Sequence, residues 1–149
     1  MSAATSPRLR FGELPGPARS AVRVFCGEMR PAEFRRHVAR YGFSLKTISM
    51  REAQRRAFRG VQAGTGPRPF KGFDDYHRWY MREGRPIPTY ASRWPVIESP
   101  FADEWLEDGW HRFHSYVEAG DTIVLVLRFH LLEMAEPGHR MGTHAASLT

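Results

Sequence analysis

Apolar positions recur along the chain with two different spacings, and each spacing predicts a type of element. Apolar residues three or four positions apart predict helices, at 31–40, 49–62, 73–83 and 109–119. Alternating or continuous apolar runs predict strands, at 21–26, 43–48, 94–98, 104–107 and 122–129. The run TIVLVLRF at 122–129 is the strongest of these. Its continuous apolar character predicts a central strand covered on both faces.

This order of elements predicts an α/β (α+β) domain, a short mixed sheet flanked by helices. The chain has 149 residues, which suits a single domain, and 42% of them are apolar, enough to fill one core. We expect this domain to span residues 21–134. Residues 1–20 are rich in Pro, Gly, Ala and Ser and are predicted to form a flexible arm, and residues 135–149 a disordered tail.

Positive charge gathers in the first part of the chain. Residues 1–60 hold 13 Lys or Arg against 4 Asp or Glu, whereas residues 61–149 hold 9 against 12. On the predicted helix that Ser49 and Glu52 open with a capping box, Arg51, Arg55 and Arg59 repeat every four residues and form one row. One hypothesis is that this row contacts nucleic-acid phosphates. The alternative is an ordinary solvated face, with Glu52 pairing Arg56.

Composition excludes several classes of protein. The single cysteine, Cys26, excludes an internal disulfide framework and a Cys-based zinc site. No apolar run approaches the roughly 20 residues of a membrane span, and the first ten residues show no secretory leader. We therefore expect a cytoplasmic protein with no membrane partner.

The most informative segment for chemistry is Asp108-Gly109-Trp110-His111-Arg112, where a short predicted strand turns into a helix. The N-terminus of a helix offers backbone N–H groups and a positive dipole end to an anion. His111 and Arg112 add two side chains that bind phosphate. Asp108 suits a water-positioning, cation-binding or His-orienting role, and the alternative is that it only caps the helix. His111 is alternatively an ordinary surface histidine, and His114, one turn on, is expected to be structural.

The segment around this turn resembles the ParB/sulfiredoxin superfamily over roughly 35 residues. The matching parts, in order, are Pro95-Val96-Ile97, Trp105-Leu106, Gly109 to Arg112, Ala119-Gly120 and Ile123 to Leu127. The D-G-x-H-R form is similar to that of ParB-like nuclease domains. The resemblance implies a domain of ParB/sulfiredoxin type. It also implies that Gly109, Trp110, His111 and Arg112 bind nucleotide phosphates.

Two departures narrow what the resemblance implies. Sulfiredoxins carry a catalytic cysteine directly before the His-Arg of this turn, where this chain has Trp110. A thiol-dependent sulfiredoxin activity is therefore not expected. The turn G-W-H-R also differs from the G-E-R-R that ParB uses for CTP, so the resemblance does not imply which nucleotide binds.

These observations lead to one principal hypothesis and two alternatives. The principal hypothesis is a phosphate-ester hydrolase, a DNase or a nucleoside triphosphatase, with Asp108, His111 and Arg112 as catalytic residues. This hypothesis includes a divalent metal ion, held by Asp108 with Glu98 or Glu104. It also includes a nucleoside triphosphate as ligand or substrate. The biological setting would be a mobile element, similar to that of the Osa-type plasmid fertility inhibitors. The alternatives are a non-catalytic nucleotide- or DNA-binding inhibitor or adaptor, and a protein whose basic face meets an acidic protein partner.

Overall fold

A computed structural model describes residues 8–62, 69–83, 94–99 and 105–132 of the chain. In chain order, its elements are η1 (Phe11–Glu13), α1 (Gly16–Cys26), α2 (Pro31–Val38), β1 (Tyr41–Ser49), α3 (Met50–Gly60), α4 (Phe73–Glu83), β2 (Val96–Glu98), β3 (Leu106–Asp108), α5 (Trp110–Glu118) and β4 (Ile123–Leu131). They form an α+β domain, as the sequence predicts.

The four described strands form one mixed sheet in the order β1-β4-β2-β3. β4 pairs antiparallel with the whole of β1 and parallel with β2, and β3 adds antiparallel to β2. The predicted central position of the strand at 122–129 is thus confirmed. Side chains alternate between the two faces of a strand, and the consecutive residues Val126 and Leu127 are both buried, so the middle of β4 is covered on both sides.

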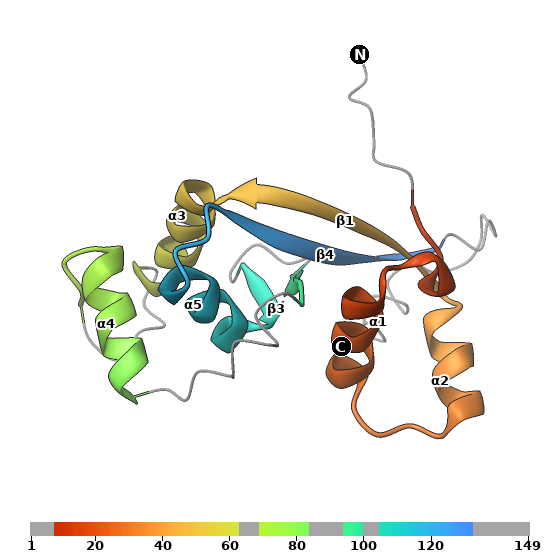
Figure 1. Ribbon diagram of the computed structural model, residues 1–149. Coiled ribbons are helices and arrows are strands. Elements are labelled where there is room, and N and C mark those ends of the chain that lie inside the picture. The colour runs from red at the N-terminus through yellow and green to blue at the C-terminus, as the bar shows by residue number, and fades with distance from the viewer. Residues whose placement is uncertain (1–7, 63–68, 84–93, 100–104, 133–149) are drawn as a thin grey trace, which may run out of the picture.

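Two hydrophobic cores lie at opposite ends of the long β1–β4 ribbon (Figure 1). The first core joins α1 and α2 to one face of the sheet through residues such as Val22, Phe34, Phe43 and Leu127. The second joins α3 and α5 to the sheet and is built from a different set of side chains: Ala53, Ala57, Val96, Trp105, Leu106, Phe113, Tyr116, Val124 and Val126. Along this ribbon, several polar side chains are half-buried or exposed: Ser44, Lys46 and Thr47 of β1 and Arg128 and His130 of β4.

The predicted strand at 21–26 is wrong, because these residues form the second half of helix α1. Alternation in the sequence AVRVFC would place Val22 and Val24 on the same face of a strand. Val22 is buried, yet Val24 is largely exposed. The buried residues Ala18, Ala21 and Val22 follow helical spacing instead, a pattern that begins before the predicted segment. The burial of one helix face, rather than the local alternation, therefore determines the conformation of this segment.

The predicted flexible arm is wrong for residues 9–20. Leu9 forms a β-bridge with Phe43, and Leu14 and Ala18 are almost completely buried in the first core. The domain therefore includes η1 and all of α1. Residues 1–7, residues 84–93 and the predicted tail 135–149 lie outside the described residues.

The other described helices and strands agree with the sequence predictions to within a few residues. Ser49 caps α3, as expected, and its hydroxyl oxygen accepts from the Glu52 backbone N–H at 3.1 Å. The Glu52 side chain does not complete the capping box, because it bonds Arg55 and Arg56. The predicted Glu52–Arg56 pair is thus confirmed.

Candidate phosphate site at the β3–α5 turn

The turn between β3 and α5 is built on Gly109. The alternative role for Asp108, as the helix cap, is wrong, because Asp108 is the last residue of β3 and Gly109 takes the N-cap position. Gly109 has φ of 99°, a left-handed conformation that favours glycine. A Cβ atom there would lie 3.1 Å from the Cα of Val96 and 3.0 Å from Nη1 of Arg112. Glycine therefore lets the turn pack directly against β2 and against the Arg112 side chain.

The Arg112 side chain lies beneath this turn, and the residue is only 6% exposed. Its Nη1 donates to the carbonyl oxygen of Pro95 at 2.6 Å, and its Nη2 donates to Oδ2 of Asp108 at 3.4 Å. The Trp94 ring lies 5.7 Å from the guanidinium carbon. One turn further along α5, the Tyr116 hydroxyl donates to the carbonyl oxygen of Trp94 at 2.9 Å. Arg112 thus fixes α5 to the start of β2 and places a buried positive charge under the turn.

His111 is exposed and points to helix α4. Its Nδ1 lies 2.8 Å from the hydroxyl oxygen of Tyr80. Burial raises the pKa of Tyr80 to about 12, so its hydroxyl group stays protonated at neutral pH. When Tyr80 donates to Nδ1, the ring proton of neutral His111 resides on Nε2, where it is available to an acceptor in solvent. Trp110, by contrast, lies edge-on to the rings of Trp105 and Phe113 and contributes to the second core.

The first backbone N–H groups of α5 make no hydrogen bond inside the helix. The first hydrogen bond inside the helix runs from the Phe113 N–H to the Gly109 carbonyl oxygen at 2.8 Å. The N–H groups of Trp110, His111 and Arg112 precede this bond, and no described side chain caps them. Three sequence-predicted elements of an anion site therefore meet at one place: helix N-terminus, exposed His111 and a positive guanidinium.

A second polar network, which sequence reasoning missed, joins α4 to α5 inside the molecule. His114 is fully buried and stacks on Tyr80 with a ring-centroid distance of 3.6 Å. Its Nδ1 lies 2.8 Å from Nδ1 of His77, whose Nε2 lies 2.7 Å from Oε2 of Glu118. Burial, with the nearby His77 and His111 as smaller causes, lowers the pKa of His114 to about 3. The expected structural role of His114 agrees with this position.

The predicted arginine row lies on the exposed face of α3, opposite the buried Ala53 and Ala57. Arg55 contacts Glu52, with 3.1 Å between Nε and Oε1, whereas Arg51 and Arg59 have no ion-pair partner among the described residues. The row is thus accessible, and its contact with nucleic acid stays a prediction.

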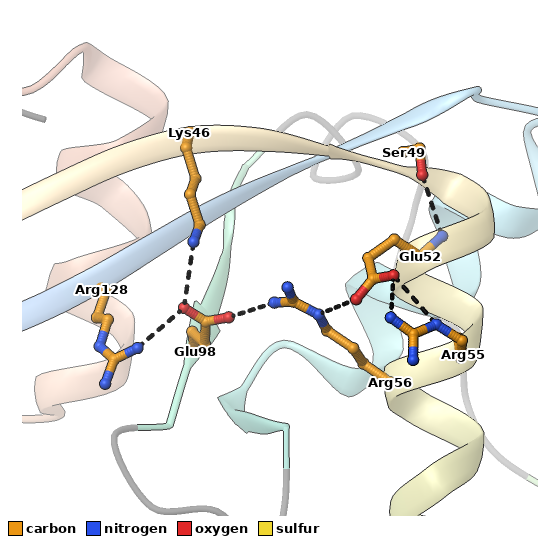
Figure 2. A network of polar contacts seen from close by, with 7 residues as sticks. All are labelled: Lys46, Ser49, Glu52, Arg55, Arg56, Glu98 and Arg128. Atoms are coloured by element: carbon orange, nitrogen blue, oxygen red, sulfur yellow. Dashed lines mark hydrogen bonds and ion pairs between the residues drawn. The ribbon is translucent and has the colours of Figure 1, made fainter. Parts of the chain in front are cut away.

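Glu98 lies at the centre of a charged cluster that the sequence did not reveal (Figure 2). Its Oε2 lies 2.9 Å from Nη1 of Arg56. Its Oε1 lies 3.5 Å from Nη1 of Arg128 and 4.0 Å from Nζ of Lys46. We call these four residues the Glu98 cluster. The hypothesis that Glu98 helps to hold a metal ion is not supported, because three cations already surround its two oxygens. Glu104, the other residue considered for that role, lies outside the described residues.

Among the described residues, no group of three or more His, Cys, Asp and Glu side chains is arranged to hold a metal ion. None of the described helices is long and apolar enough to cross a membrane.

Comparisons with known proteins give no match: no family model, no curated protein and no solved structure corresponds to this chain. The resemblance to the ParB/sulfiredoxin superfamily accordingly stays a prediction from the sequence.

Proposed function

We propose that the protein binds a phosphate group of a nucleotide or a nucleic acid at the β3–α5 turn. The observation that carries this proposal is the uncapped start of α5 beside the exposed His111. Three backbone N–H groups and a His side chain there are donors that a phosphate oxygen accepts from. The Arg112 guanidinium contributes its charge from below the turn, while its hydrogen bonds to Pro95 and Asp108 hold the site together.

This proposal gives Arg112 a different task from the one that the family resemblance implies. Direct phosphate contact by Arg112 would require it to exchange bonds that it already makes inside the protein. His111 and the backbone of the turn are therefore the proposed contacts, and Arg112 is a positioning residue. This set of donors supports recognition of phosphate without selectivity for one base.

Calorimetric titration with ATP tests the proposal, using the wild-type protein and the variant His111→Gln. We expect the variant to bind about ten-fold more weakly, because a neutral amide replaces an imidazole that can donate to the phosphate as a cation. The matched control is His37→Gln on α2, at the other end of the molecule, which should bind like the wild type. Equal affinity of all three proteins would place ATP elsewhere.

Phosphate-ester hydrolysis is the second candidate function, and the position of Asp108 favours it. Its carboxylate is 37% exposed and adjoins the start of α5. A carboxylate in this place can accept a proton from an attacking water or share a divalent ion with the phosphate. Assays of ATP and plasmid DNA hydrolysis with and without Mg²⁺ distinguish a hydrolase from the non-catalytic binding module.

A further inference from the structure

We propose that the Glu98 cluster, together with Arg55, forms a binding surface for the phosphodiester backbone of a nucleic acid. This surface lies on β1, β4 and α3, and the inference does not depend on the phosphate site at the β3–α5 turn. Figure 2 shows Lys46, Arg56 and Arg128 directed at the same carboxylate from three different elements.

The cluster carries more positive than negative charge. Glu98 faces three cations, and Glu52 links Arg56 to the further cation Arg55. Four cations therefore share two carboxylates, which leaves an excess of two positive charges. The distances agree with incomplete compensation, since Arg56 approaches Glu98 to 2.9 Å while Lys46 stays at 4.0 Å.

Glu98 holds the cations in place and leaves part of each accessible. The carboxylate is 7% exposed, whereas the side chains of Lys46, Arg128 and Arg56 are 46%, 38% and 30% exposed. Arg128 uses one nitrogen, Nη1, toward Glu98. Among the described residues, no partner is present for its other guanidinium nitrogens, so they can donate to a phosphate oxygen.

The pKa of His130 responds to the charges of the cluster. This pKa is lowered by burial and, to a smaller extent, by the charges of Arg8, Arg128 and Lys46, while Glu98 raises it. A polyanion bound to the cluster would oppose the same cations and raise this pKa.

The surroundings of the cluster favour a nucleic acid over an acidic protein as the partner. Through Arg56, Glu52 and Arg55, the cluster continues into the exposed arginine row of α3, so cations extend over three elements. Protein interfaces usually add large apolar or aromatic anchors. The exposed large apolar residues in the described part of the chain are Val24, Phe25 and Ile123, and none belongs to the cluster.

A charge-matched pair of double variants tests the surface. Lys46→Gln with Arg128→Gln removes two cations from the cluster, and Arg35→Gln with Arg36→Gln removes two exposed cations from α2. We measure the affinity for a labelled 20-base-pair duplex by fluorescence anisotropy at several salt concentrations. The first variant should bind about ten-fold more weakly, with a salt slope smaller by about two, and the second should resemble the wild type.

An NMR measurement on the wild-type protein gives a second readout that needs no substitution. Saturation with the duplex should raise the pKa of His130, while that of His37 on α2, which faces Arg40 and Glu33, should not change. Equal loss of affinity in both double variants, an unchanged His130 pKa, or no duplex binding by the wild type would overturn the proposal. Competition by poly-glutamate at lower concentration than by DNA would also overturn it, in favour of an acidic protein.

Discussion

Arg112 and Pro95 are joined by a hydrogen bond of 2.6 Å between Nη1 of the guanidinium and the backbone carbonyl oxygen, and both residues are buried. This bond ties the first turn of α5 to the residue that precedes β2. The sequence analysis assigned Arg112 to phosphate binding, and in the structure its side chain holds the β3–α5 turn against β2.

Arg112→Met should lower the free energy of unfolding by about 2–4 kcal/mol, because the buried Pro95 carbonyl oxygen and Asp108 both lose a donor. Arg51→Met, on the exposed face of α3, is the matched control and should cost less than about 0.5 kcal/mol. Urea denaturation followed by circular dichroism gives both values. A cost for Arg112→Met that is no larger than for the control would mean that the bond does not stabilise the fold.

Gly109→Ala should destabilise the protein more than Gly120→Ala. Both glycines have positive φ, 99° and 75°, so each substitution carries a backbone cost of about 1–3 kcal/mol. A Cβ at Gly109 would additionally meet Val96 and Arg112, whereas nothing lies within 4 Å of one at Gly120. We expect a difference of at least about 1 kcal/mol in the free energy of unfolding. Equal costs would show that the turn is not closely packed on β2.

The buried His114 predicts a loss of stability in acid. Its pKa is about 3 in the folded protein, against an ordinary value of 6.5. The unfolded chain therefore binds one proton more between these values, and this contribution to stability, complete above pH 6.5, falls as the pH decreases. The expected loss from His114 is about 2 kcal/mol between pH 6.5 and pH 5.

The variant His114→Phe keeps a ring against Tyr80 and removes the titrating group. Its free energy of unfolding should decrease less than that of the wild type over the same pH interval, by about 2 kcal/mol. The same decrease in both proteins would show that the titration of His114 does not cause the acid sensitivity.

Asp108→Asn separates phosphate binding from hydrolysis. The melting temperature should stay within a few degrees, because Gly109 and not Asp108 occupies the N-cap position and the Asn oxygen can still accept from Arg112. In the absence of divalent ions, removing a negative charge beside the site should strengthen ATP binding by about three- to ten-fold. If the protein is a hydrolase, turnover should fall by about 100-fold or more in the same variant. Weaker ATP binding would contradict the proposed position of the phosphate.

Local sequence signals predicted much of the fold. The capping serine at 49, the Pro31 start of α2 and the apolar run of β4 each act over a few neighbouring residues, and the structure agrees with all three. The error at α1 arose because AVRVFC alternates weakly, whereas the helical spacing of the buried residues begins at Ala18, before this segment, and packing of Ala18 and Val22 in the first core favours the helix. Contact with distant residues decided that segment, and such contacts cannot be derived from spacing alone.

The candidate site was predictable to a similar extent. The turn at Gly109 and its neighbour His111 follow from the sequence, since a strand, a glycine and a helix start are local features. The direction of the Arg112 side chain was not predictable, because Pro95 is 17 positions away. The Glu98 cluster joins residues from β1, α3, β2 and β4, with Arg56 and Glu98 separated by 42 positions. The strand register that aligns them becomes known only with the fold.

The most direct test of phosphate binding at the β3–α5 turn is an NMR titration of ¹⁵N-labelled wild-type protein with ATP in the absence of metal ions. We expect the backbone amide signals of Trp110, His111 and Arg112 to shift together with one dissociation constant, because these groups donate to the phosphate. Signals from β1 residues such as Lys46 should change less. Unchanged signals from the three amides at saturating ATP, or shifts confined to the Glu98 cluster, would contradict it.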